Sequence, residues 1–244
     1  MQTTGNTIII TGGTSGIGLG FAELFMRLGN TVIVCGRRED RLDAIRERHP
    51  EIITQVCDVT ITDHRKAFSE WVIENHPSAN ILLNNAGIQL ATDLTHPAEL
   101  DKVWREIETN LVAPVHFSSL FAQHFMKYET SAIINISSGL AFAPLAFMPI
   151  YCATKAAVHS FTLSLRHQLS GSSVRVFEII PPSVDTELGH EHRDDSSQSH
   201  GGMPVIAFLD EALRAIQDDL YEAPIGQAKG LYMKREELFS QMNR

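Results

Sequence analysis

The sequence predicts an α/β protein with one doubly wound parallel sheet and helices on both of its faces. Three observations predict this fold: short strand-like runs alternate with helix-like runs, the strand-like runs are apolar throughout, and no linker divides the 244 residues. Strands separated by helices pair in parallel through right-handed crossovers, and strands covered on both faces have few polar positions. We therefore expect a single domain over residues 1–244.

The elements follow from the periodicity of the apolar residues. Strand-like runs lie at residues 7–10, 31–35, 52–56, 81–84, 132–136 and 174–180. Helix-like runs lie at residues 18–28, 41–48, 65–75, 98–127, 151–169 and 205–220, and the fourth contains Pro114, where it could break. Residues 185–204 are rich in His, Ser, Asp and Gly and lack periodicity, so we expect a substrate lid near residues 185–220.

A glycine-rich turn joins the first strand to the first helix. Glycines let a backbone approach a pyrophosphate closely, and a helix N-terminus offers free N–H groups and a positive dipole. Such glycines can also be purely structural, but their place after the first strand of an alternating chain favours dinucleotide binding in a Rossmann-type sheet. The turn consists of Thr11, Gly12, Gly13, Thr14, Ser15, Gly16, Ile17 and Gly18.

Two arginines, Arg37 and Arg38, follow the second strand. A site specific for NAD offers an acidic residue here to the ribose 2′-hydroxyl, whereas guanidinium groups suit a 2′-phosphate through charge and bidentate hydrogen bonding. The alternative is a solvated basic corner paired with Glu39 and Asp40. We expect NADP rather than NAD, with Arg37 as the stronger candidate because it is nearer the strand end. Asp58, after the third strand, is a candidate acceptor for the adenine amino group.

Tyr151 and Lys155 lie four residues apart at the start of a predicted helix. Positions i and i+4 share one helix face, and a nearby positive charge lowers the pKa of a phenol. Ser138 adds a hydroxyl from the end of the neighbouring strand. Together the three side chains could hold a carbonyl or alcohol oxygen while a proton moves, although a Tyr-x-x-x-Lys pair alone is more often helix surface.

The order of these motifs resembles that of the short-chain dehydrogenase/reductase family over about residues 5–188. The resemblance implies that Tyr151 is the general acid–base residue and that Lys155 binds the nicotinamide ribose and lowers the tyrosine pKa. It implies that Ser138 orients the substrate oxygen and that Asn110 holds a water in a proton relay. The other residues implied in cofactor binding are Gly12, Thr14, Ser15, Gly16, Ile17, Gly18, Asp58, Val59, Asn85, Ala86, Gly87, Pro181, Val184 and Thr186.

Two departures from the family pattern have consequences. Pro182 stands where the family usually has glycine; it removes a backbone N–H and stiffens the turn, which weakens the expected contacts of Val184 and Thr186 with the nicotinamide carboxamide. Residues 234–239 form a charged, helix-like tail, whereas many tetrameric relatives end in a strand that builds an interface. We therefore expect a homodimer. The tail and the lid resemble a little-characterised branch of the family that is found beside lipoteichoic-acid alanylation genes.

The segment between Ser138 and Tyr151 is apolar and could flank an apolar substrate, with core packing or a subunit contact as the alternative. Its apolar side chains are Leu140, Phe142, Leu145, Phe147 and Met148. The histidines and acidic residues of the lid match no zinc-binding pattern, so we expect no metal. These lid residues are His190, His192, Asp194, Asp195 and His200.

Composition excludes several classes of protein. A net charge of −9 argues against a nucleic-acid binder, and three cysteines without a C-x-x-C pair suit a reducing compartment. No signal peptide is visible, and the uncharged stretch at residues 130–154 contains Asn135, Pro144 and Pro149, which disfavour a membrane span. We expect a cytoplasmic protein without a membrane or nucleic-acid partner.

The function that these residues favour is NADPH-dependent reduction of a small-molecule carbonyl, or the reverse oxidation of a secondary alcohol, by hydride transfer. One alternative is a non-enzymatic NADP-binding sensor or scaffold, because a fold does not guarantee chemistry. Another is an acyl-carrier-protein ketoreductase, which would need a basic docking patch, and the acidic composition of this chain does not indicate one.

Overall fold

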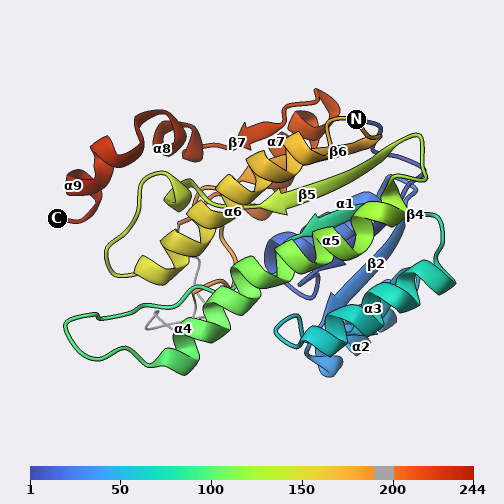
Figure 1. The fold of residues 1–244 in the computed structure, drawn as a ribbon, viewed down its shortest axis with the longest axis horizontal. Helices are drawn as coiled ribbons and strands as arrows, with labels where there is room; N and C mark the ends of the chain where they lie inside the picture. The colour runs from blue at the N-terminus through green and yellow to red at the C-terminus, as the bar shows by residue number, and fades with distance from the viewer. Residues whose placement is uncertain (190–200) are drawn as a thin grey trace.

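A computed structural model describes residues 1–189 and 201–244, and within them seven strands form one sheet (Figure 1). The strands are β1 (Thr7–Thr11), β2 (Thr31–Gly36), β3 (Ile52–Val56), β4 (Ala79–Asn84), β5 (Ser131–Ile136), β6 (Val174–Ile180) and β7 (Glu222–Pro224). Their order is β3-β2-β1-β4-β5-β6-β7, and every neighbouring pair is parallel. The single parallel sheet is confirmed. The sequence missed β7, because three residues ending in proline carry no periodic signal.

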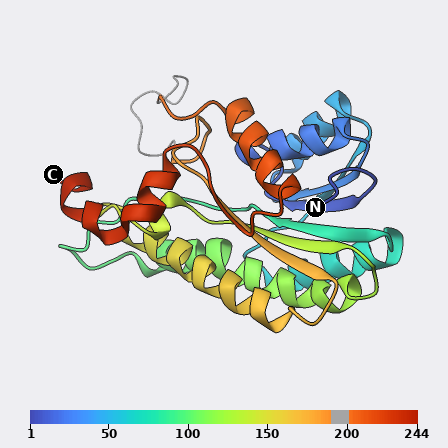
Figure 2. The same ribbon diagram turned by 90° about the horizontal axis from the view of Figure 1, so that it is seen from above.

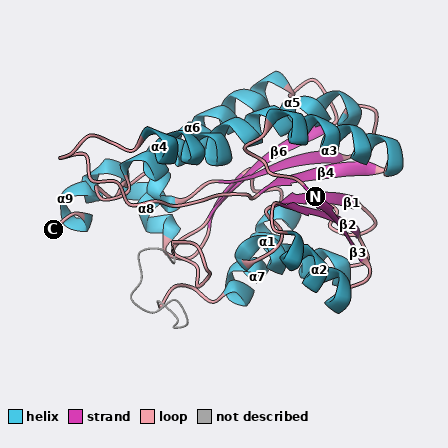
Figure 3. Ribbon diagram, turned by 90° about the horizontal axis from the view of Figure 1, so that it is seen from below, coloured by secondary structure: helices cyan, strands magenta, loops and turns pink. Residues whose placement is uncertain are grey.

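Helices cover both faces of the sheet, as Figure 3 shows: α1, α2 and α7 lie on one face and α3 to α6 on the other. They are α1 (Gly16–Arg27), α2 (Glu39–Arg48), α3 (Thr62–Asn75), α4 (Leu100–Ile107), α5 (Ala113–Phe125), α6 (Pro149–Gln168), α7 (Val205–Gln217), α8 (Ala228–Lys234) and α9 (Phe239–Met242). The short 3-10 segments are η2 (Gly139–Ala141) and η4 (Arg235–Leu238).

The helical run predicted at residues 98–127 is continuous but changes its winding. Between α4 and α5, residues Glu108–Val112 form a π-helical turn, η1. Pro114 follows this turn at the start of α5, where its missing N–H cannot donate to the carbonyl of Asn110 one turn earlier. Because π turns within helices are frequent at functional sites, the position of Asn110 inside this turn agrees with a functional role.

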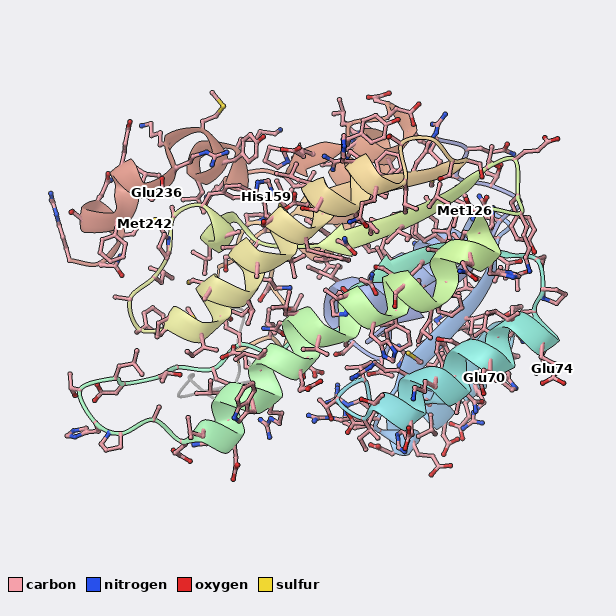
Figure 4. All side chains as sticks on the ribbon, viewed as in Figure 1. Glu70, Glu74, Met126, His159, Glu236 and Met242 are labelled. Carbon is pink, nitrogen blue, oxygen red and sulfur yellow. The ribbon has the colours of Figure 1, made fainter. Side chains whose placement is uncertain are left out.

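Alternate residues of each strand supply two separate apolar layers. Ile8 and Ile10 pack with Phe21 and Phe208 on one face of the sheet, and Ile9 packs with the α5 side chains on the other. All of these isoleucines are fully buried, as expected for strands that helices cover on both sides. On the outer side, Figure 4 shows Glu70 and Glu74 pointing away from α3 into solvent.

The sheet has one topological switch point, between β1 and β4. Crossovers leave this point in opposite directions, which opens a crevice at the carboxyl ends of the two strands. Thr11 closes the bottom of the crevice: its hydroxyl oxygen accepts the N–H groups of Asn85 (3.0 Å) and Ala86 (3.1 Å). The glycine turn and the segment after β4 therefore face each other across the crevice.

The C-terminal part of the predicted lid region is the helix α7, which ends at Gln217 rather than at residue 220. It lies against α1, where a Cβ on Gly20 would come within 2.7 Å of Leu209. The lid residues His190, His192, Asp194, Asp195 and His200 lie outside the described residues. None of the helices that the described residues form has the length and apolar character that crossing a bilayer requires.

Candidate active site

The glycine turn between β1 and α1 has the geometry of an anion-binding loop. Gly12 and Gly16 adopt φ angles of +65° and +53°, which favour glycine. A Cβ on Gly12 would lie 2.8 Å from the Cα of Ala86, and one on Gly16 would lie 3.1 Å from the Cβ of Thr186. The side chain of Ser15, at the N-cap of α1, forms no capping hydrogen bond, so it leaves the first N–H groups of the helix for another acceptor. A pyrophosphate fits this turn.

The segment after β4 borders the same turn. Asn85 donates from Nδ2 to the carbonyl oxygens of Thr11 (3.0 Å) and Gly12 (3.1 Å). A Cβ on Gly18 would lie 2.4 Å from that Nδ2 atom, so glycine is required for the close approach of α1. The structure thus brings together predicted cofactor residues that are distant in the sequence.

The basic corner after β2 lies beside the glycine turn, since a Cβ on Gly36 would come within 2.7 Å of the Thr14 side chain. Arg37 and Arg38 are both exposed at the start of α2. Burial and the charges of Arg41 and Arg37 lower the pKa of Arg38, and the charges of Glu187 and Asp40 oppose this, so several guanidinium groups gather here beside two carboxylates. A second anion can therefore be held a short distance from the pyrophosphate turn.

Asp58 and Val59 follow β3 at this end of the sheet. One carboxylate oxygen of Asp58, Oδ1, accepts the Thr60 N–H (2.9 Å) and the Thr60 hydroxyl (2.8 Å). Val59 is buried, and its carbonyl accepts a hydrogen bond from Arg65 (2.6 Å). These bonds fix the loop, and the predicted contact of Asp58 with adenine stays a prediction.

Tyr151 and Lys155 occupy the first turns of α6 and are almost fully buried, at 5% and 4% exposure. The Lys155 ammonium donates to the carbonyl of Ile136 at the end of β5 (2.9 Å), and its Nζ lies 5.8 Å from the centre of the Tyr151 ring. Ser138 follows β5 and is also buried; its Oγ accepts the Leu140 N–H (3.1 Å). That bond leaves the proton of Ser138 to be donated to another acceptor.

Asn110 joins this group from the π turn. Its Oδ1 accepts the Ile88 N–H (2.9 Å), and its Nδ2 donates to the Ile88 carbonyl (2.9 Å) and to Thr154 Oγ1 (3.1 Å). A Cβ on Gly87 would lie 3.5 Å from Asn110 Oδ1 and 3.6 Å from Lys155 Nζ. The four predicted catalytic side chains therefore converge where the segment after β4 meets α6.

The electrostatics of Tyr151 differ from the expectation drawn from the sequence. Burial raises the pKa of Tyr151; the hydrogen bond with Ser138 opposes this rise, and the charges of Cys152 and Glu106 add to it. Burial also lowers the pKa of Lys155 to about 8, against the opposing effect of Glu106 and Glu178. In the protein without cofactor, burial is the largest influence on the pKa of Tyr151 and acts upward, so the prediction that Lys155 lowers the tyrosine pKa stays a prediction.

Glu106 is a member of this site that sequence reasoning missed. It lies in α4, one helical turn before Asn110, and is only 1% exposed. Its Oε1 accepts the Leu90 N–H (3.0 Å), and burial raises the pKa of its carboxyl to about 7. The one signal available in the sequence was the spacing of four residues, which places Glu106 and Asn110 on the same helix face.

The apolar segment after Ser138 divides into two parts. Leu140, Leu145 and Met148 pack against Tyr151 and Cys152, beside the proton-transfer group. Phe142 instead is core packing, the alternative that the sequence left open, because it is buried between the Tyr232 and His159 rings, with centroid separations of 4.9 and 4.7 Å. Phe147 is 54% exposed.

The C-terminal tail (residues 228–244) holds this segment from outside, as the red ribbon beside η2 in Figure 2 shows. Asn243 donates from Nδ2 to the Pro144 carbonyl (3.1 Å), and its Oδ1 accepts the Ala146 N–H (2.6 Å). The Arg235 guanidinium lies 5.3 Å from the Phe142 ring centre. Figure 4 labels Glu236 and Met242 on the tail and His159 on α6.

The turn after β6 contains Pro181, Pro182, Val184 and Thr186. The Pro181 carbonyl accepts the Gly139 N–H (2.9 Å), and Val184 forms a parallel bridge with Met203. Thr186 lies against Gly16. The turn therefore reaches the N-terminus of α1, and the predicted weakening of the carboxamide contacts of Val184 and Thr186 stays a prediction.

Comparison with known proteins decides the family. The model of the short chain dehydrogenase family matches residues 6–197. The chain belongs to that family. Its members in these comparisons are oxidoreductases, and the protein is an enzyme of this class that acts on CH–OH or carbonyl groups of small molecules.

Three similar proteins illustrate the relationship. An uncharacterized oxidoreductase DltE of Bacillus subtilis is 45% identical over 100% of this chain and 98% of its own length. A Sphingobium yanoikuyae short-chain dehydrogenase solved with NADPH is 30% identical, with a TM-score of 0.80 over 89% of this chain and 86% of the other. A Burkholderia phymatum enzyme solved with NAD shares the fold at 22% identity, with a TM-score of 0.84 over 100% and 97% of the two chains.

No three histidine, cysteine or acidic side chains within residues 1–189 and 201–244 are grouped so that they could hold a metal ion. The hydroxyl, phenol, amide and ammonium groups at the site are suited instead to orienting an oxygen and moving a proton.

The contact of Asn243 with the segment at residues 144–146 should control the local stability of that segment. We expect Asn243→Ala to speed hydrogen–deuterium exchange at the Ala146 amide, since the lost bond contributes about 1 kcal/mol. Peptide-level exchange measured by mass spectrometry checks this. The exposed amide Gln241, changed to alanine, is the matched control; equal exchange in both variants would show that the tail does not hold the segment.

Proposed function

We propose that the protein is an NADPH-dependent reductase of a small carbonyl compound, or catalyses the reverse oxidation of a secondary alcohol. The observation that carries this proposal is the burial of Lys155 beside Tyr151 and Gly87, at the crevice that the glycine turn also borders. A buried ammonium next to a buried phenol is costly unless it serves chemistry.

The residues have distinct parts in the proposed reaction. The nicotinamide, when bound, supplies or accepts a hydride at the carbon of the reacting group. Ser138 donates a hydrogen bond to the substrate oxygen, on which negative charge grows during reduction. Tyr151 delivers the proton to that oxygen, and the high pKa that burial gives the phenol keeps this proton in place until it is needed.

Lys155 and Asn110 support this transfer. The Lys155 ammonium, which donates to the Ile136 carbonyl, would bind the nicotinamide ribose and would stabilise the phenolate that proton delivery leaves behind. Asn110 keeps Ile88 in place, and so keeps the wall of the crevice next to Gly87 in place. The proposed water of the relay would lie beside Asn110.

The choice of NADP rests on the basic corner at Arg37 and Arg38. No acidic side chain ends β2, and the guanidinium groups of Arg37 and Arg38 are exposed, so both are available to form charge-assisted hydrogen bonds with a 2′-phosphate. The NADPH of the similar Sphingobium enzyme supports the choice, while the NAD of the Burkholderia enzyme makes a direct test necessary.

Other features support an apolar substrate, a cytoplasmic location and a dimeric state. The cluster of Leu140, Leu145 and Met148 beside Tyr151 supports an apolar substituent on the carbonyl carbon. Cys35, Cys57 and Cys152 are free and buried, which supports a cytoplasmic enzyme. The C-terminal tail folds onto its own chain rather than forming a strand, which supports a homodimer over a tetramer.

The first test concerns the proton donor. Tyr151→Phe should lower kcat roughly 100-fold or more with a panel of ketones and aldehydes, because the proton to the substrate oxygen is lost. Absorbance at 340 nm follows the reaction, and the exposed Tyr221, changed to phenylalanine, is the control. Unchanged turnover in Tyr151→Phe would refute the mechanism, and NADPH binding without turnover of any panel member would favour the sensor.

The second test concerns the cofactor. Arg37→Ala should weaken NADPH binding by about 10-fold or more, the equivalent of one charge-assisted hydrogen bond, and leave NADH binding almost unchanged. Fluorescence titration with each dinucleotide measures this. Arg48→Ala removes an equal charge from the far end of the same helix and serves as control; equal losses for both dinucleotides would contradict the assignment.

A further inference from the structure

Glu106 is a buried carboxyl that the mechanism above does not use. Its helix, α4, is otherwise largely exposed: Leu100 and Trp104 are 63% and 60% exposed, whereas Glu106 is 1% exposed. A charged side chain is rarely placed on the inner side of a short helix in preference to these apolar residues. Because Glu106 is buried, its charge does not serve to keep the surface of α4 soluble, and its inward position needs another explanation.

The contacts of Glu106 continue those of Asn110. Glu106 accepts the Leu90 N–H at 3.0 Å, and Asn110, one turn later, holds both backbone groups of Ile88 at 2.9 Å. The two side chains thus fix consecutive parts of the segment that follows Gly87. Gly87, directly before this segment, faces Lys155: a Cβ on it would lie 3.6 Å from Lys155 Nζ.

The charges around Glu106 come mainly from α6, which packs against α4. Lys155 lowers the pKa of the Glu106 carboxyl, and Glu106 in turn raises that of Lys155 and of Tyr151 and Cys152. On its own helix, Arg105 acts in the same direction as Lys155. From β6, Glu178 acts on Lys155 but less strongly than Glu106 does.

We propose that Glu106 is a positioning residue of the proton-transfer site, whose carboxylate holds the crevice wall at Leu90 and maintains the positive charge of Lys155. Its role in catalysis rests on the proposed function, although the charge coupling itself does not. The Glu106 carboxylate therefore has two separable roles. The hydrogen bond to the Leu90 N–H needs only an oxygen acceptor, whereas stabilising the protonated form of Lys155 needs the negative charge.

The sign of the pH dependence follows from the two groups together. Burial raises the pKa of Glu106 and lowers that of Lys155, while each group's charge favours the charged form of the other. Removing the carboxylate charge lowers the pKa of Lys155 further, because burial is then opposed by Glu178 alone among the acidic groups that act on it. Lys155 would therefore lose its proton at a lower pH.

The substitution Glu106→Gln separates these two roles, since the amide oxygen can still accept the Leu90 N–H but carries no charge. The pKa of Lys155 is measured in the cofactor-free protein from the pH titration of its ¹³Cε resonance, assigned by its loss in Lys155→Met. We expect the midpoint to fall by about half a pH unit or more in Glu106→Gln. Glu99→Gln, an equal change of charge at the exposed start of α4, should leave it unchanged.

The pH profile of NADPH oxidation gives a second readout that a merely structural role would not move. In Glu106→Gln, the loss of activity at high pH should begin at a lower pH than in the wild type, with little change of the melting temperature. Glu106→Ala should lower the melting temperature as well. A Lys155 midpoint in Glu106→Gln equal to that of the wild type overturns the proposal. Absence of any NADPH turnover in the wild type would instead count against the proposed function, since the titration requires no cofactor.

Discussion

The burial of the Lys155 ammonium is the constraint on which the rest of the site depends. An ammonium that loses its water must find other partners, or it loses its proton. The carbonyl of Ile136 is one partner, at 2.9 Å, and the charges of Glu106 and Glu178 are the others. The Ile136 carbonyl can serve as a partner only because β5 ends beside α6. The Glu106 charge can act on Lys155 only because α4 turns this carboxyl inward. The positions of Gly87 and Asn110 follow from the same packing.

The two halves of the proposed site, one for the nucleotide and one for the substrate, are built differently. The nucleotide half depends on local backbone geometry, namely the positive φ angles of Gly12 and Gly16 and the close approach that Gly18 allows. The segment beside the reacting group depends on distant contacts, because Asn243 and Arg235 hold it from the end of the chain. The family model ends at residue 197, so these contacts lie in the part of the chain that the family pattern does not describe.

The sequence predicted most of the sheet, the glycine turn and the Tyr151–Lys155 pair, because each of these is a pattern of neighbouring residues. It missed β7, the inward position of Glu106 and the hydrogen bonds of Asn243 with residues 144–146, because these depend on contacts between distant segments. The deep burial of Tyr151, which raises its pKa, also could not be predicted, because a helix spacing shows a nearby charge but not the loss of solvent.

Lys155, Tyr151 and the basic corner at Arg37 and Arg38 are proposed to belong to one NADP site. A crystal structure of the protein with bound NADP tests it most directly. We predict that Lys155 Nζ lies within about 3.2 Å of a hydroxyl of the nicotinamide ribose, and that the 2′-phosphate lies at a similar distance from Arg37 or Arg38. A ribose that contacts neither Lys155 nor Tyr151, or a 2′-phosphate that extends into solvent away from both arginines, would contradict it.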